Sequence, residues 1–214
     1  MSSVRQRART PEQKQARKNA IVQAARQLMN ESSIDEITIA ALADCSGLAR
    51  GTAYTYFTSK EALFLSVMES DLRQWVDDLT VQVEAMNAED VRDALPAIIG
   101  ESLWHHPRLL DLMATLHATL ETRASEGDIR QFKLALADIT RPFAALLEAK
   151  CQLAEGAGYS FLLTANALAI GLGQMAKPTP RVAAVIDTEP ALHRFKIDFE
   201  QQFTQTLHSV MQSL

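Results

Sequence analysis

The chain has 214 residues, 47% of them hydrophobic, which is enough apolar material for one large or two small domains with a real core. Its two cysteines form no CxxC pair and follow no secretory signal, so we expect a cytoplasmic protein without disulfides. No apolar run reaches membrane-spanning length, and the low Gly and Pro counts (8 and 7), without alternating β-branched runs, predict an all-α fold.

The charge is unevenly distributed along the chain. Residues 1–60 hold nine basic and five acidic residues, net +4, so the remainder carries −9 of the total of −5. A basic segment joined to an acidic body is typical of nucleic-acid binding, because phosphate binding depends on local charge. Arg5, Arg7 and Arg9 fit either a solvated tail or an arm that reaches into a minor groove.

The first helix is predicted to begin at Thr10-Pro11-Glu12-Gln13, with a capping threonine, proline at the first helical position and glutamine at the third. Apolar residues then recur with helical spacing, at Ile21, Ala24, Ala25 and Leu28. This helix is therefore amphipathic, and we expect it to pack across two short helices that follow.

Those short helices form a helix-turn-helix pattern between Thr38 and Lys60. Thr38 is a candidate N-cap for a helix whose apolar face includes Leu42. Gly47 ends that helix, because glycine accepts the left-handed conformation of a C′ residue. A second helix follows to Phe57, so residues 1–57 are predicted to form a basic arm and a three-helix DNA-binding domain.

The outward face of the second short helix carries no carboxylate. It consists of an arginine, a glycine and hydroxyl side chains, namely Arg50, Gly51, Thr52, Tyr54, Thr55 and Tyr56. Guanidinium and hydroxyl groups can donate to phosphate or base edges, and glycine permits close approach of the backbone. Lys60, in a capping box Thr58-Ser59-Lys60-Glu61, is expected at a helix N-terminus that favours phosphate. The alternative is a small helical packing unit with ordinary surface Tyr and Thr.

A second domain, residues 58–214, is predicted to be entirely helical and to bring the total to about nine helices. A long helix is expected from Ser59 to about Met86, and breakers then delimit helices at 88–104, 107–123, 126–151, 158–176 and 190–213. Residues 177–189, with Pro178 and Pro180, are the one long connection that we expect. We also expect them to be the least ordered part of the second domain.

The last two predicted helices are the expected homodimer surface. Residues 158–176 are apolar nearly all round and include small residues that allow close helix packing, namely Ala165, Ala169, Gly171 and Gly173. The final helix adds an apolar stripe of Leu192, Phe195, Phe199, Phe203, Leu207, Val210 and Leu214. Pairing both helices with a second copy would form a four-helix interface. The alternative is that a stripe packs on its own body.

The middle helices are expected to enclose a small apolar effector. The candidate lining residues are large and apolar or amphipathic: Trp75, Met86, Trp104, Met113, His117, Leu120 and Phe132. Plain core packing is the alternative for each. No metal or other cofactor is expected, because the histidines 105, 106 and 117 lack a Cys or carboxylate that completes a ligand set. No phosphate-cradling loop, nucleophile elbow or isolated carboxylate pair indicates an enzyme.

The run from Ile37 to Leu63, with its Gly51-Thr52-x-Tyr54-x-Tyr56-Phe57-x-Ser59-Lys60-Glu61 core, resembles the DNA-binding signature of the TetR/AcrR family of bacterial transcriptional regulators. The resemblance extends from Ile21 to Leu63. Cys45 and Leu48 depart from it, standing where the family often has Ala and Val. It implies phosphate contacts by Thr38, Tyr54, Tyr56 and Lys60, and base or phosphate contacts by Arg50 and Thr52.

The resemblance also implies the function that we expect: a homodimeric repressor that binds double-stranded DNA at a palindromic operator and is released by its effector. The alternative is a helical carrier of hydrophobic ligands with no role on DNA. Activation in place of repression stays open.

Overall fold

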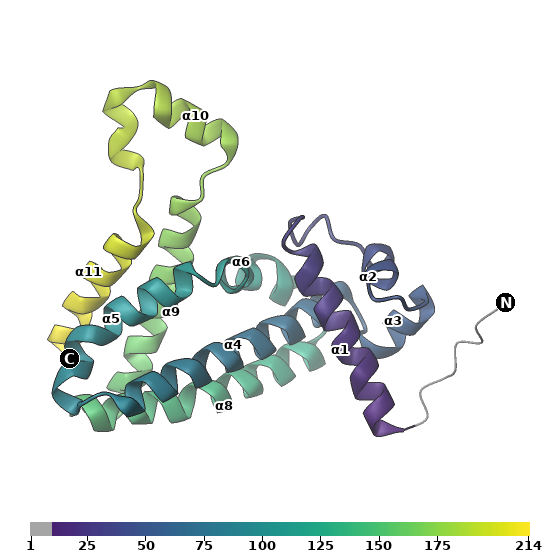
Figure 1. Ribbon diagram of the computed structural model, residues 1–214, viewed down its shortest axis with the longest axis horizontal. Helices are drawn as coiled ribbons and strands as arrows, with labels where there is room; N and C mark the ends of the chain where they lie inside the picture. The colour runs from purple at the N-terminus through teal and green to yellow at the C-terminus, as the bar shows by residue number, and fades with distance from the viewer. Residues whose placement is uncertain (1–9) are drawn as a thin grey trace. The chain divides into compact units, whose positions relative to one another are not determined.

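The computed structural model describes residues 10–214, apart from the side chain of Ala53. The described residues form α-helices, one π-helical turn and one 3-10 helix, and contain no strand (Figure 1). The predicted all-α class is therefore confirmed. The basic arm with Arg5, Arg7 and Arg9 lies outside the described residues. Contacts divide the chain into two compact units, with the division between Val67 and Met68.

The first unit contains three helices and the start of a fourth: α1 (Pro11–Leu28), α2 (Ile39–Cys45), α3 (Arg50–Tyr56) and α4 (Lys60–Ala85). The predicted cap of α1 is present, because Gln13 donates its backbone N–H to Thr10 Oγ1 at 3.3 Å. Ile21, Ala25, Leu42 and Phe64 are almost fully buried. The first unit includes the first turns of α4, as far as Val67.

The second unit holds the rest of α4 and the remaining elements. These are α5 (Ala88–Trp104), α6 (Pro107–Thr115), the π-helical turn η1 (Leu116–Leu120), α7 (Glu121–Arg123), α8 (Glu126–Cys151), α9 (Ala157–Ala176), α10 (Pro180–Thr188), the 3-10 helix η2 (Pro190–Phe195) and α11 (Phe199–Ser213). Helix α9 packs against α6, α8 and α11, and α11 also packs along α5. No described helix has the length and apolar character needed to cross a bilayer.

Most predicted helix boundaries agree closely with the structure, but the C-terminal region differs. Residues 177–189 were predicted as a connection without a helix, but they contain α10. Pro180 is the first residue of this helix, a position that proline favours. The predicted helix over 190–213 is wrong in its first part. Lys196 is extended, and Asp198 starts α11 by accepting the Gln201 N–H at 3.0 Å. With η1 splitting the 107–123 helix as well, the described chain has eleven α-helices instead of about nine.

The apolar stripe predicted for the last helix mostly faces its own chain. Phe199, Phe203 and Leu207 are 2% exposed or less, because α11 packs on α5 and α9 of the same chain. Of the stripe, Phe195 is 57% and Leu214 41% exposed, while Leu192 and Val210 are half-buried. The alternative of packing on its own body therefore holds for the centre of the stripe.

The small residues of α9 are also divided between two faces. Ala165, Ala169 and Gly173 are buried, and a Cβ on Gly173 would lie 3.6 Å from Leu110. Gly171 is exposed, and a Cβ there would meet nothing within 4 Å. Three of the four small residues thus serve packing within the chain, and only Gly171 is left for a second copy.

Candidate nucleic-acid interface

The turn between α2 and α3 is fixed by backbone hydrogen bonds around Gly47. Thr38 caps α2 by accepting the Ala41 N–H at 3.2 Å. At the other end, Gly47 has φ +68°, which allows the Gly47 N–H to bond Asp44 O at 3.2 Å and the Leu48 N–H to bond Ala43 O at 3.0 Å. This pair of bonds is the Schellman arrangement. Both sequence predictions, the cap at Thr38 and the stop at Gly47, are confirmed.

Helix α3 presents Arg50, Gly51 and Tyr54 to solvent, with Tyr54 57% exposed. Thr52 and Tyr56 are half-buried, and the apolar side chain of Phe57 is buried just beyond the helix. The helix contains no acidic residue. Its outer face therefore combines one guanidinium with hydroxyl groups, a set of donors suited to phosphate oxygens and base edges.

Gly51 is not required by the fold itself. A Cβ added there would meet nothing within 4 Å, and φ at this position is not in the left-handed region. The Gly51 carbonyl accepts a hydrogen bond from the Thr55 hydroxyl, one turn later in the same helix, at 3.0 Å. A side chain at this position would therefore extend into open space.

Lys60 lies where it was predicted, in the first residue of α4, but its ammonium already has partners within the chain. It donates to Ile34 O at 2.9 Å and to Asp35 O at 3.1 Å, in the loop that leads to Thr38. The cap also differs from the predicted box, because Ser59 Oγ accepts the Ala62 N–H at 3.0 Å. The sequence signal for this role is weak, since a lysine near a helix N-terminus does not reveal which distant carbonyls it can reach.

A second lysine supports the same unit and was not predicted. Lys18 of α1 places its Nζ 5.7 Å from the centroid of the Phe57 ring, within the range of a cation–π contact. This contact joins α1 to the residue that follows α3. The two residues are far apart in the sequence, so no local pattern could reveal the pair.

The seven predicted effector residues lie in the second unit with different exposures. Trp75, Met113, Leu120 and Phe132 are buried, Met86 and Trp104 are half-buried, and His117 is exposed. Trp75 donates its indole N–H to Ser102 Oγ at 2.9 Å, and Trp104 stacks on Phe199 with ring centroids 5.3 Å apart. His117 Nδ1 lies 3.0 Å from a Glu121 carboxylate oxygen, while His105 and His106 contact the backbone carbonyls of Glu101 and Ser102 near the end of α5.

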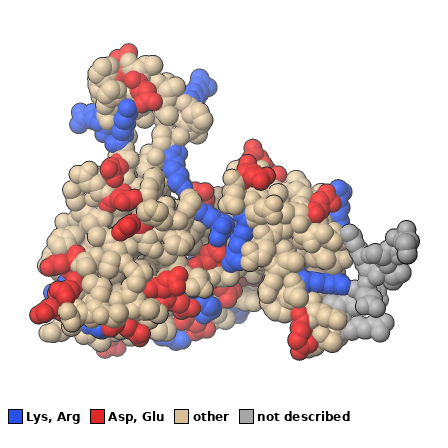
Figure 2. Space-filling view, in the orientation of Figure 1, with Lys and Arg blue, Asp and Glu red and all other residues tan. Residues whose placement is uncertain are grey.

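Neither of two cavities in the second unit is lined by any of these seven residues. One, of about 620 Å³, is lined by Asn87, Arg92, Lys150 and Cys151, among others. There Lys150 donates to Glu84 O and Met86 O, at 3.1 and 2.8 Å, and so caps the end of α4. The other, of about 200 Å³, lies between the end of α9 and the α10 region. Acidic side chains gather at the α5 end of this unit (Figure 2), consistent with its net negative charge.

Two family models match successive parts of this chain. Residues 21–67 match the bacterial regulatory proteins of the tetR family, and residues 69–212 match the tetracyclin repressor-like C-terminal domain. The chain belongs to the TetR family. The resemblance found in residues 21–63 is thus confirmed and extended over the second unit.

Individual relatives agree with this assignment. The chain is 30% identical over 118 residues to the HTH-type transcriptional regulator EthR of Mycolicibacterium smegmatis, covering 54% of this chain and 52% of that protein. It is 28% identical over 110 residues to an uncharacterized HTH-type transcriptional regulator, YvdT of Bacillus subtilis, covering 51% of this chain and 56% of the relative. The chain thus spans about half the length of the curated relatives that it matches.

Solved structures of two other regulators share the fold. A TetR transcriptional regulator from Rhodococcus sp. RHA1 superposes with a TM-score of 0.59 over 93% of this chain and 94% of its own, at 17% identity. The fatty acid degradation regulator FadR from Bacillus halodurans gives a TM-score of 0.54 over 96% of both chains, also at 17% identity. At this identity the likeness concerns the fold alone.

Proposed function

We propose that this TetR-family chain is a cytoplasmic, non-enzymatic homodimeric repressor, which binds a palindromic operator and leaves it when a small, largely apolar effector binds. The observation that carries the proposal is the outer face of α3, where Arg50, Gly51 and Tyr54 are exposed and no carboxylate opposes a phosphate. Thr38, Thr52 and Tyr56 complete the proposed DNA contacts. In this proposal Lys60 supports the loop before α2. Its ammonium already donates to two backbone carbonyls, so a direct contact with phosphate is less favoured for Lys60 than for the other residues.

The exposed face of α9 supports the homodimer. Residues at steps of four, Tyr159, Leu163, Ala167, Gly171 and Met175, are all exposed along this helix. Such a series forms one ridge of a helix surface, and two ridges of this kind interlock when helices of two copies cross. Small residues at its centre permit close approach. A two-fold dimer would present two copies of α3 and hence favour a palindromic site.

The second unit supports an apolar effector. Trp75, Met113, Leu120 and Phe132 supply large apolar side chains, and Ser102 adds a hydroxyl to which Trp75 already donates. Helix α4 passes without a break from the first unit into the second. A ligand that favours a different arrangement of α4 would therefore alter the spacing of the two α3 helices. Shifting such an equilibrium from 1:99 to 99:1 needs about 5.5 kcal/mol of differential binding.

The test is selection of the purified protein against a random duplex pool, followed by affinity measurements at several salt concentrations. We expect enrichment of a palindrome and a steep loss of affinity as salt rises, because phosphate contacts release counterions. The double substitution Arg50→Ala, Tyr54→Phe should abolish this binding and leave the fold intact, since both side chains are exposed. Absence of any enriched sequence, with ligand-free protein, would refute the operator and favour the carrier alternative.

A further inference from the structure

Residues 177–198, termed the arm, stand out from the rest of the second unit between α9 and α11 (Figure 1). The arm contains α10 and η2, which pack on each other and include no buried residue. Yet it carries large apolar side chains with about half of their surface exposed: Val182 (48%), Val185 (54%) and Phe195 (57%). Val182 and Val185 are three residues apart and hence share one face of α10. A nine-residue helix with no buried side chain has little to stabilise it in water.

The arm is nevertheless built as a defined element. Lys196 and Asp187 form an ion pair of 2.7 Å across it. At its base, Lys177 pairs with Asp111 at 3.2 Å and lies 6.0 Å from the ring centroid of Trp104. Trp104 in turn stacks on Phe199, the first residue of α11. The arm is thus tied to the body where it leaves α9 and where it enters α11, and its apolar face is held outward.

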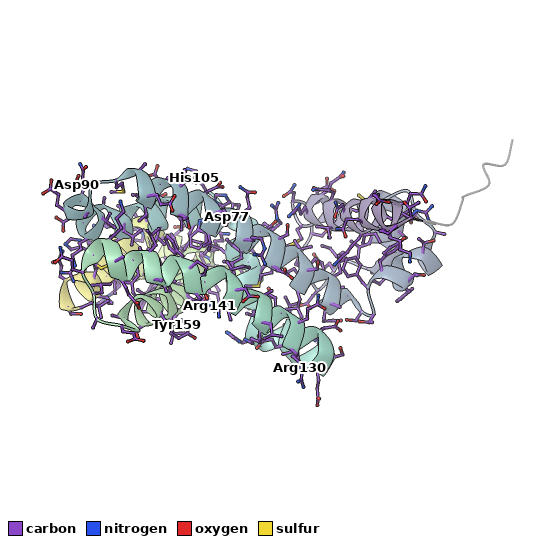
Figure 3. The ribbon with its side chains drawn as sticks, turned by 90° about the horizontal axis from the view of Figure 1, so that it is seen from below. Asp77, Asp90, His105, Arg130, Arg141 and Tyr159 are labelled. Carbon is purple, nitrogen blue, oxygen red and sulfur yellow. The ribbon has the colours of Figure 1, made fainter. Side chains whose placement is uncertain are left out.

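The apolar surface of the arm is continuous with the exposed ridge of α9. Met175, the last member of that ridge, is 56% exposed and also lines the cavity of about 200 Å³ with Ala183, Ile186 and Phe195 of the arm. Figure 2 shows basic and acidic side chains at the outer parts of the arm. Figure 3 labels Tyr159, which lies at the opposite end of the ridge from Met175. The exposed α9 ridge therefore meets the exposed apolar surface of the arm where Met175 and Phe195 line the same cavity.

We propose that the arm clasps a second copy of this chain, burying Val182, Val185 and Phe195 against it as an extension of the α9 ridge. The inference rests on the proposed homodimer. Because the arm begins two residues after Met175, pairing the ridges of two copies brings each arm beside the other copy. A two-fold axis makes this contact reciprocal, so each dimer gains it twice.

The first test is the dimer dissociation constant of the full chain, measured by sedimentation equilibrium. The double substitution Val182→Ser, Val185→Ser should raise this constant by tenfold or more. Val81→Ser should not, because Val81 is also an exposed valine (66%) but lies on α4, outside the proposed contact. Leu163→Asp, on the α9 ridge, should abolish the dimer. An unchanged constant for the arm variant, with a dimeric wild type, would overturn the clasp and leave the homodimer standing. A wild type that is monomeric at every concentration would overturn both.

Hydrogen exchange of the wild type provides a second test that needs no variant. Amides of residues 181–188 should be protected at protein concentrations well above the dissociation constant and should lose that protection well below it. Equal protection at both concentrations would refute the clasp, even if the arm variants failed to fold.

Discussion

Lys60→Met separates the two possible roles of this lysine, support of the loop before α2 and contact with phosphate. Methionine retains most of the apolar stem but removes the ammonium that donates to Ile34 O at 2.9 Å and to Asp35 O at 3.1 Å. Hydrogen bonds from a charged donor contribute about 1.5–3 kcal/mol each. Asp35 is exposed, so water can replace the donor there, and we expect a net loss of about 2 kcal/mol. This corresponds to a fall in Tm of about 4–8 °C when the 214-residue chain unfolds as one cooperative unit.

The same variant makes a separate prediction for DNA. If Lys60 neutralised a phosphate, its replacement would lower the slope of log affinity against log salt by about 0.9, the value expected for one phosphate. With the ammonium held on the two carbonyls, we expect the slope to stay unchanged. Affinity should fall only to the extent that the displaced loop moves Thr38 at the start of α2.

The assay combines thermal unfolding with a salt titration of binding to the selected operator. Arg50→Ala is the matched control, because Arg50 is exposed in the first turn of α3 and no described hydrogen bond holds it to the body. It should leave stability within about 0.5 kcal/mol and lower both DNA affinity and the salt slope. An unchanged Tm together with a reduced slope for Lys60→Met would refute the reasoning and place the ammonium on DNA.

Three further predictions concern the body and the thiols. Gly158→Ala should destabilise the chain by roughly 1–3 kcal/mol in thermal unfolding, because the added Cβ would collide with the carbonyl oxygen of Ala144. Ellman's reagent should label exposed Cys45 in the native protein well before buried Cys151, since burial raises the pKa of the Cys151 thiol. Burial also acts to raise the pKa of the Glu121 carboxyl, but bonds with Lys133 and His117 lower this pKa overall, below its ordinary value. Glu121 therefore stabilises the fold at pH values above its ordinary pKa, and this stabilisation is lost as pH falls through the lowered pKa. In urea unfolding at several pH values, Glu121→Gln should remove this part of the pH dependence of the unfolding free energy.

Each of these has a result that would contradict it. Wild-type stability in Gly158→Ala would mean that α8 and α9 separate easily, and equal labelling of both thiols would mean that Cys151 is open to solvent. If Glu121→Gln showed the same acid loss of stability as the wild type, the dependence would belong to other carboxyl groups.

Local sequence chemistry was sufficient for most of the helices and for the turn before α3. Thr10, Thr38 and Ser125 begin helices because their side chains accept an N–H three residues on, and these bonds are made within one turn of chain. Gly47 ends α2 because its own conformation permits it. The outer residues of α3 were identified for the same reason, since helical spacing fixes which of them share a face.

Tertiary structure decided what depends on residues far apart in the chain. The apolar pattern of α11 in the sequence is equally compatible with packing on a second copy and on its own chain. Only the packed structure assigns Phe199, Phe203 and Leu207 to their own chain. Lys60 reaches carbonyls 25 and 26 positions away, which no local pattern records. The arm with α10 is the same case in reverse. From the sequence, Pro178 and Pro180 predict an interruption of helical structure. Only the fold shows that α10 begins at Pro180 and that apolar side chains of the arm stay exposed.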